Sequence, residues 1–276
     1  MSEGLGTWID GVAATSVPAD DRGLNYGDGV FETVLLRAGK PRFIEAHLER
    51  LQLGLARLKI PFPAAGGLQA DIARAAALAP SRAILKIVVT RGSTQRRGYA
   101  PAGLVQARRI VSLWETAPVV FEPGKGVDLR VAQLRLPEHS ALAGIKHLNR
   151  LENVLAAGED TGSSSFDALM LDTADHVISG TACNVFIVKA GALLTPPVDR
   201  VGIAGVMRSI VLREAPRLGI AAEQRVLTLA DVRAADGMFI TNARIGVVPV
   251  QRVGEHVIPM SPVVTRLAAH IEALDA

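Results

Sequence analysis

Lysine is the residue type in this chain with the clearest potential for covalent chemistry. Of its 30 Lys and Arg residues only six are lysines, and only Lys86 and Lys146 have apolar neighbours on both sides. Apolar surroundings or a nearby cation can lower the pKa of an amine enough to make it a nucleophile. Lys86 falls within a predicted strand, where an outward-facing lysine is the ordinary outcome. Lys146 precedes a polar segment, 147–153, and is the better candidate, although an exposed surface lysine remains the commoner outcome of such a pattern.

Strands and helices that would position these side chains alternate along the chain, without an internal repeat. Leucines at helical spacing predict a helix over 44–58, which Pro61 would end. Further helices are predicted over 68–78, 147–159, 205–218 and 263–274. Runs rich in β-branched residues predict strands over 30–36, 83–90, 109–114, 127–136, 168–171, 184–188, 192–195, 224–228, 237–241 and 246–250.

A Pro- and Gly-containing stretch near the middle of the chain divides these elements into two groups. It covers 118–126 and is the predicted linker. It would separate a small α+β domain over 1–117 from a large domain over 127–276. The predicted fold class is therefore α/β (α+β), with two domains and a ligand cleft between them.

Composition narrows the class of protein further. Hydrophobic residues make up 49% and charged residues 21%, and the net charge is +3, which is an ordinary globular balance. No long basic run is present, so the sequence predicts no nucleic-acid partner, while scattered arginines suit small anionic ligands. No signal peptide or apolar run long enough for a membrane span is visible, so we expect a cytoplasmic protein with no membrane partner.

Several common enzyme signatures are missing from the sequence. Cys183 is the single cysteine, which excludes an internal disulfide and a Cys-rich zinc site. The sequence has no HExxH motif, nucleophile elbow, phosphate loop or dinucleotide fingerprint. We therefore predict no metal site.

An ordered set of motifs resembles the 4-amino-4-deoxychorismate lyases, which belong to the fold-type-IV pyridoxal-phosphate enzymes. The longest is LAGIKHLNRLENVL at 142–155, which resembles the cofactor-lysine region. The remaining motifs are DRGL at 21–24, YGDGVFET at 26–33, HLERL at 47–51, RG at 91–92, RGY at 97–99, GIAGVMR at 202–208 and ITNA at 240–243. Each is weak alone, but their order from the N-terminus to residue 250 is specific.

The resemblance implies pyridoxal 5'-phosphate as cofactor and assigns residues to it. Lys146 would hold the cofactor covalently and shuttle protons as the catalytic residue. Arg50 would bind the cofactor phosphate, because a fixed cation suits a dianion. Phosphate would also bind backbone N–H groups at a helix start and, at the 240–243 turn, the hydroxyl of Thr241 and a backbone donor of Asn242. These further cofactor residues are Val206, Met207, Thr241 and Asn242.

The resemblance also implies a small-molecule substrate, 4-amino-4-deoxychorismate, which would be converted to 4-aminobenzoate and pyruvate for folate synthesis. Candidates to hold its carboxylates are Arg91, Arg97 and Tyr99, although surface arginines are common. Asn149 would orient the substrate or Lys146, or else cap the neighbouring helix. A homodimer is implied as well.

One position departs from the family pattern. The family has Glu five residues before Asn184, where it holds the protonated ring nitrogen of the cofactor, and here that position is Ser179. A serine hydroxyl cannot supply the charge that keeps the ring protonated, so the cofactor would be a weaker electron sink. We expect this to favour elimination over transamination.

Two other functions stay open at this point. An aminotransferase for branched-chain or D-amino acids would share the fold, because function depends on the site and not on the fold. A pyridoxal-phosphate-binding protein without activity is the second alternative, and the presence of Lys146, Arg50 and Thr241 argues against it. The products distinguish the three: 4-aminobenzoate with pyruvate, exchanged 2-oxoacids, or neither.

Overall fold

The chain falls into two compact units, which a computed structural model describes for residues 4–63, 66–94, 98–101, 106–119, 121–122, 124–159 and 165–274. The first unit holds the described residues of Met1–Pro118 together with Ile145–Asn149, and the second those of Val119–Gly144 and Arg150–Asp275. The segment around Lys146 therefore belongs to the first unit, although the sequence predicted it within a continuous domain over 127–276.

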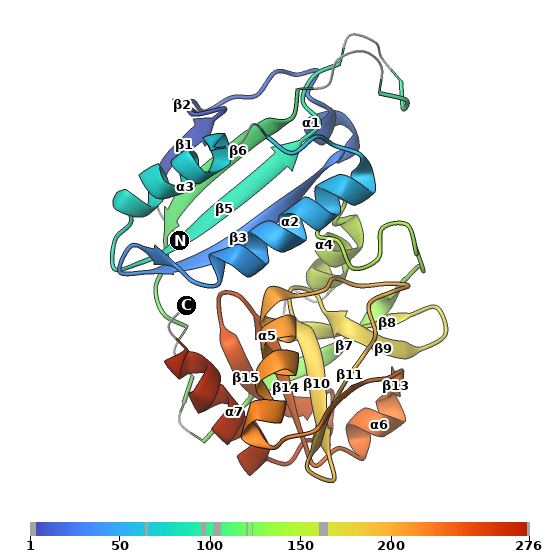
Figure 1. Cartoon of the computed structure of the whole chain (residues 1–276). Coiled ribbons are helices and arrows are strands. Elements are labelled where there is room, and N and C mark those ends of the chain that lie inside the picture. Colours follow the sequence, from blue (N-terminus) through green and yellow to red (C-terminus); the bar gives the residue numbers. More distant parts are fainter. Residues whose placement is uncertain are drawn as a thin grey trace. The chain divides into compact units, whose positions relative to one another are not determined.

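A six-stranded antiparallel sheet forms the first unit, in the order β2-β1-β6-β5-β3-β4. The strands are β1 (Gly4–Ile9), β2 (Val12–Ala13), β3 (Gly29–Arg37), β4 (Lys40–Pro41), β5 (Arg82–Thr90) and β6 (Arg108–Glu115). The helices are α1 (Arg22–Tyr26), α2 (Ile44–Leu58) and α3 (Gly67–Ala77). Helices α2 and α3 cover one face of the sheet (Figure 1).

The core of the first unit lies between those two helices and the sheet. Alternate residues of β5, such as Leu85 and Ile87, point into it, as period-2 alternation requires. Leu51 and Leu55 of α2 pack against them from the helix side. Burial of this apolar face fixes the rotation of α2, and so fixes which of its side chains face β3.

A mixed sheet of ten strands forms the second unit, in the order β12-β11-β10-β14-β15-β7-β8-β9-β13, with β16 beside β15. Its strands are β7 (Val127–Leu136), β8 (Asp167–Asp172), β9 (His176–Gly180), β10 (Asn184–Lys189), β11 (Ala192–Thr195), β12 (Ala222–Gln224), β13 (Leu227–Thr228), β14 (Gly237–Asn242), β15 (Gly246–Val253) and β16 (His256–Val257). Its helices are α4 (Leu151–Gly158), α5 (Val206–Glu214), the 3-10 turn η1 (Pro216–Leu218), α6 (Leu229–Arg233) and α7 (Pro262–Ala273). The aromatic rings of Phe186 and Phe239 stack at 4.8 Å in the middle of this sheet.

Three predicted elements differ from the structure. The predicted helix 147–159 begins only at Leu151, because the backbone before it pairs with β3. The predicted helix 205–218 is α5 followed by η1, since Pro216 has no N–H to continue an α-helix. The predicted strand 224–228 is divided between β12 and β13, which pair with different strands.

Candidate active site

Lys146 lies on a short extended segment that adds to the edge of β3. The Phe31 N–H donates to the Lys146 carbonyl at 3.0 Å, and the Leu148 N–H donates to the Gly29 carbonyl at 3.0 Å. A Cβ on Gly29 would come within 2.5 Å of the Val89 carbonyl oxygen and 2.8 Å of the Leu148 side chain. Glycine is therefore required at the start of β3 for the lysine segment to approach so closely.

The Lys146 side chain is half-buried beside an aromatic ring. Its Nζ lies 4.2 Å from the centroid of the Phe31 ring. Such a contact orients an ammonium group over the ring face. Lys86, the other apolar-flanked lysine, is exposed, and its Nζ is 5.8 Å from the same centroid. The structure thus distinguishes the two candidates by burial and by approach to Phe31.

A buried carboxylate on the next residue of β3 holds two side chains of α2. Glu32 Oε1 accepts a hydrogen bond from Arg50 Nε at 2.8 Å, and Glu32 Oε2 accepts one from His47 Nδ1 at 2.6 Å. Arg50 Nη2 also donates to Oε2, so the arginine and carboxylate form a bidentate pair. This pair fixes the plane of the Arg50 guanidinium.

Charge states in this cluster follow from burial and from the hydrogen bonds. Burial alone would raise the pKa of the Glu32 carboxyl, but the hydrogen bonds from His47 and Arg50 and the positive charge of Arg50 outweigh burial and hold the pKa below its usual value. Burial lowers the pKa of His47, and the positive charges of Arg50 and Lys146 act in the same direction. His47 is therefore a neutral donor at pH 7, and Glu32 with Arg50 is the charged pair.

The start of α5 in the second unit has the features of an anion site. No side chain caps this nine-residue helix, and its first turn contains no acidic residue. The N–H groups of its first turn lack partners within the helix and carry the positive end of its dipole. Val206 and Met207 occupy this turn, as the sequence predicted.

The turn before α5 is tightly built. Asn184 Nδ2 donates to the Ile203 carbonyl at 2.9 Å, and a Cβ on Gly205 would lie 1.9 Å from Asn184 Oδ1. Gly144 pairs with the same turn: its N–H donates to Gly202 and its carbonyl accepts from Ala204, each at 2.9 Å. An anionic group such as the cofactor phosphate fits this uncapped, glycine-lined helix start.

The 240–243 turn requires a correction to the role of Thr241. Its hydroxyl is buried and donates to the Gly246 carbonyl at 2.6 Å, so in this structure it is not a donor to a phosphate. The Asn242 side chain also closes the turn, because its Oδ1 accepts from the N–H groups of Arg244 and Ile245. The backbone N–H groups of Thr241 and Asn242 remain candidates for phosphate contact.

Asn242 further contacts Cys183, at 3.2 Å from Nδ2 to Sγ. Burial raises the pKa of the Cys183 thiol well above its usual value, and the nearby Asp167 carboxylate adds to this effect. The thiol is thus protonated and unreactive at neutral pH. It belongs to the second unit's core.

Ser179 is buried on β9, opposite Met170 of β8. Residues paired directly across two strands share a face of the sheet. Asn153 of α4 reaches Met170, with 3.7 Å from Nδ2 to Sδ, and donates to the Thr181 carbonyl at 2.8 Å. Ser179 thus lies beside a neutral thioether on the same face of the sheet.

The predicted substrate residues have different surroundings. Arg91 is buried and donates to Asp28 and to the carbonyls of Leu58 and Lys59. We therefore correct the predicted role of Arg91 in holding a substrate carboxylate, because its guanidinium already binds the Asp28 carboxylate and two backbone carbonyls at the end of α2. Tyr99 is 88% exposed, and Arg97 lies outside the described residues.

Asn149 has a role that the sequence did not predict. Its Nδ2 donates to the Gly27 carbonyl at 3.3 Å. It does not cap α4, whose N-cap is Arg150 and carries no side-chain cap hydrogen bond. The alternative capping role was wrong, because α4 begins later than the periodicity of its leucines indicated, while the role of Asn149 in orienting the substrate or Lys146 stays a prediction.

Sequence reasoning did not single out Glu32 and His47. A usable signal was present, since a lone glutamate within the apolar run 30–36 falls on a position that alternation places in the core. A buried carboxylate requires a cationic or hydrogen-bonding partner. The motif at 47–51 supplies both partners one helical turn apart.

Two features are absent from the described residues. No group of three or more His, Cys, Asp or Glu side chains that could hold a metal ion occurs among them. Among the same residues, no helix is both long and apolar enough to cross a membrane.

The two-unit α/β fold, with a lysine segment against β3 and an anion-binding helix start, is that of fold-type-IV pyridoxal-phosphate enzymes. A family model described as amino-transferase class IV matches residues 29–253. The chain belongs to this family. The predicted fold class, enzyme class and cofactor are thereby confirmed at the level of the family.

Individual relatives are similar over nearly the whole chain. An aminodeoxychorismate lyase from Vibrio harveyi is 37% identical over 244 residues, covering 88% of this chain and 89% of the relative. The crystal structure of 4-amino-4-deoxychorismate lyase from Pseudomonas aeruginosa matches with a TM-score of 0.89 and 39% identity, covering 98% of this chain and all of that one. A putative branched-chain-amino-acid aminotransferase from Methanocaldococcus jannaschii is 32% identical over 240 residues, covering 86% and 83% of the two chains.

Proposed function

We propose that the protein is an aminodeoxychorismate lyase that converts 4-amino-4-deoxychorismate to 4-aminobenzoate and pyruvate. The observation that carries the proposal is the similarity to two lyases, at 37% and 39% identity, over at least 88% of this chain. The half-buried Lys146 beside Phe31 supports it, since a lysine must be available at the reacting carbon.

Pyridoxal phosphate would supply an electron sink for the carbanion formed at C4 of the substrate. Lys146 would hold the cofactor at rest and, once its amine is released, accept the C4 proton. The C3–O bond would then break, so that the enolpyruvyl group leaves as an enolate and takes up a proton to give pyruvate. The ring would become aromatic, which makes the elimination favourable. Lys146 is thus the proposed catalytic base.

Each unit carries groups suited to an anionic cofactor. On the first unit, Arg50 is aligned by Glu32 for contact with a phosphate dianion. On the second unit, the first-turn N–H groups of Val206 and Met207 are suited to a phosphate. Ser179 would face the ring nitrogen as a neutral group.

The direct test is a coupled assay with enzymatically generated aminodeoxychorismate on wild type, Lys146→Ala and Lys86→Ala. Lys86 is the matched control, because it is the other apolar-flanked lysine and is exposed. We expect Lys146→Ala to abolish 4-aminobenzoate and pyruvate formation and Lys86→Ala to retain most of it. Full activity of Lys146→Ala would disprove the assignment.

An aminotransferase is the second candidate, favoured by the similarity to the M. jannaschii protein. Ser179 separates the two, because a carboxylate at that position would protonate the ring nitrogen and strengthen transamination. We expect Ser179→Glu to increase pyridoxamine-phosphate formation from amine substrates, and the exposed control Ser81→Glu to leave it unchanged. Wild-type exchange of amino acids for 2-oxoacids without 4-aminobenzoate production would favour the aminotransferase instead.

If the purified protein bound the cofactor but turned over neither substrate class, it would be a non-catalytic binding protein.

We also infer a cytoplasmic homodimer in the folate pathway. One exposed apolar face supports the dimer: Leu151, Val154 and Leu155 of α4 follow helical i, i+3, i+4 spacing and are at least 61% exposed. Light scattering of the purified protein measures the oligomeric state, and a monomeric mass across micromolar concentrations would contradict the dimer.

A further inference from the structure

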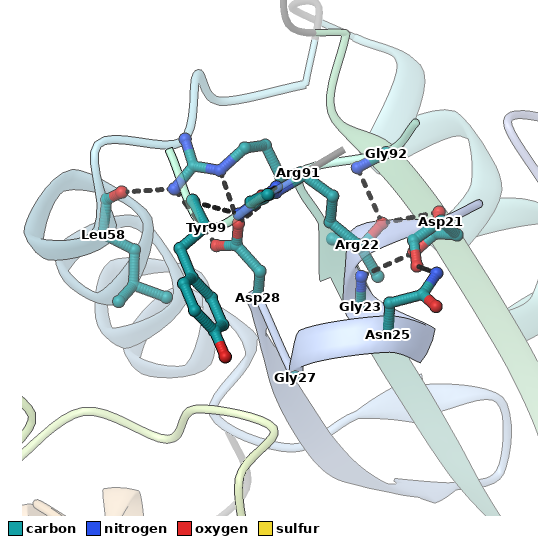
Figure 2. Close-up of polar contacts among 12 residues, drawn as sticks. Asp21, Arg22, Gly23, Asn25, Gly27, Asp28, Leu58, Arg91, Gly92 and Tyr99 are labelled. Atoms are coloured by element: carbon teal, nitrogen blue, oxygen red, sulfur yellow. Dashed lines mark hydrogen bonds and ion pairs between the residues drawn. The ribbon is translucent and has the colours of Figure 1, made fainter. Parts of the chain in front are cut away.

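A buried arginine at the start of α1 holds the backbone of the loop that contains Tyr99. Arg22 is 4% exposed. Its Nη1 donates to the Gly98 carbonyl at 2.8 Å and its Nη2 to the Tyr99 carbonyl at 2.6 Å (Figure 2). Its third nitrogen, Nε, donates to Asp28 Oδ2 at 2.8 Å. All three guanidinium nitrogens therefore have acceptors, two of which belong to a loop 76 and 77 residues further along the chain.

Asp28 orients Arg22 by sharing its carboxylate with a second arginine. Arg91 Nε donates to Asp28 Oδ2 at 2.7 Å, and Arg91 Nη2 donates to Oδ1 at 3.1 Å. Burial would raise the pKa of Asp28, but the hydrogen bonds and charges of Arg91 and Arg22 outweigh it and lower the pKa. Arg91 also binds the carbonyl of Leu58, the last residue of α2, and that of Lys59, its C-cap. A continuous chain of charge-assisted bonds thus links the end of α2 to the loop.

The backbone that carries Arg22 is fixed independently of the loop. Asp21 caps α1 through its Oδ1, which accepts from the Gly23 N–H at 2.7 Å. Its Oδ2 accepts from the Thr90 hydroxyl at 3.0 Å, and the Arg22 N–H donates to the Gly92 carbonyl at 2.9 Å. These bonds anchor α1 to the end of β5, so Arg22 projects from a rigid base.

Aromatic contacts extend this arrangement to the Tyr99 side chain. The Arg22 guanidinium carbon lies 4.7 Å from the centroid of the Tyr26 ring, and the Tyr26 and Tyr99 rings are 5.7 Å apart at 58°. Tyr99 is nonetheless 88% exposed. Its direction is therefore set by the loop backbone and by one neighbouring ring, while its surface stays open to a ligand.

We propose that Arg22 is a positioning residue for the substrate loop. It acts through the Gly98 and Tyr99 carbonyls and does not itself contact substrate, because each guanidinium nitrogen already has an acceptor and its side chain is buried. The inference rests on the proposed function and on the role that the sequence predicts for Tyr99 in holding the substrate carboxylates. A lysine cannot replace Arg22, because one ammonium centre does not match the planar geometry of three separate acceptors.

The test compares Arg22→Lys with the matched control Arg109→Lys in the loaded enzyme. Arg109 is also a largely buried arginine of the first unit, and its guanidinium is paired to a buried carboxylate, that of Asp71, and not to residues 98–101. We expect Arg22→Lys to raise KM for aminodeoxychorismate roughly ten-fold, the usual effect of losing a charge-assisted bond, with kcat within about two-fold of wild type. Arg109→Lys should change neither.

Limited chymotrypsin digestion measures the anchoring without any activity assay. Cleavage after Tyr99, followed by mass spectrometry, should be several-fold faster in Arg22→Lys than in wild type or Arg109→Lys. If Arg22→Lys yields too little folded protein, Asp28→Asn provides the second variant, because it removes the acceptor that orients Arg22. The cofactor absorbance band and the melting temperature establish that each variant is folded and loaded.

The outcomes separate this inference from the proposed function. Cleavage that is no faster than in the Arg109 control overturns the anchoring. Faster cleavage with an unchanged KM overturns the effect on substrate binding. A wild-type enzyme without lyase turnover refutes the proposed function and with it the substrate role of the loop, while the digestion still decides whether Arg22 anchors it.

Discussion

The carboxylate of Glu32 determines how the first unit presents its cationic side chains. It is fully buried, and it accepts hydrogen bonds from Arg50 and His47. An unpaired carboxylate in this position would be costly, so the cluster forms as a unit. Arg50 is thereby held in a single orientation before any ligand binds, which lowers the entropy cost of binding a phosphate.

Glu32→Gln tests this orientation at the level of one residue. The amide keeps the shape of the side chain but loses the charge and one acceptor oxygen, so Arg50 is no longer held bidentately. We expect the dissociation constant for pyridoxal phosphate to rise roughly ten-fold, as for the loss of a charge-assisted hydrogen bond. Titration of the apoenzyme with cofactor, followed by absorbance, measures it.

Glu49→Gln is the control for that substitution, because Glu49 lies on the exposed face of the same helix. Its cofactor affinity should match wild type. Equal affinities of Glu32→Gln and wild type would show that Arg50 does not need its partner to bind the cofactor.

Helix α2 connects core packing to the candidate site. One face packs Leu51 and Leu55 into the core, and the same helix presents His47 and Arg50 to β3. The end of the helix is bonded to Arg91, a cation at the negative end of the helix dipole. The orientation of Arg50 therefore depends on how the helix packs.

Two leucines of α2 test the packing with one type of substitution. Leu55 is 1% exposed and Leu53 is 68% exposed. Leu55→Ala should lower the free energy of unfolding by about 2–5 kcal/mol, because it removes buried methyl groups and leaves a cavity. Leu53→Ala should stay within about 0.5 kcal/mol of wild type. Urea unfolding measures both, and equal losses would mean that the helix face is assigned incorrectly.

Over the whole molecule, ionised carboxylates stabilise both units. Hydrogen bonds and charges hold the pKa of Asp28 and Glu32 in the first unit below their usual values, and they do the same for Glu214 and Asp231 in the second. Burial also lowers the pKa of His47. A group with a depressed folded-state pKa stabilises the protein above its unfolded-state pKa and loses that contribution as pH falls.

The free energy of unfolding should therefore decrease as the pH is lowered. The loss begins below the ordinary His value of 6.5, where unfolded His47 takes up a proton. It steepens below the ordinary Glu value of 4.5, where the unfolded carboxylates do the same. Urea unfolding between pH 7.5 and 4 at constant cofactor concentration tests this. Constant or rising stability over that range would contradict the assigned pKa directions.

The sequence by itself determined the features that depend on local patterns. Leucine periodicity and Pro61 placed α2 at Ile44–Leu58, and strand-type runs placed β7 and β11 at their observed bounds. The ordered motifs identified the family and its cofactor. Lys146 was singled out as the candidate catalytic lysine from its apolar flank and from the resemblance, because both signals lie close together along the chain.

The tertiary structure alone decided the contacts between residues far apart in the sequence. Residues 146–148 are extended and not helical, because β3 takes up their backbone hydrogen bonds. Arg91 binds Asp28, and Arg22 binds the loop at Gly98, across separations of 63 and 76 residues. A buried charge is paired with the acceptor that folding brings to it, and local spacing contains no record of that partner.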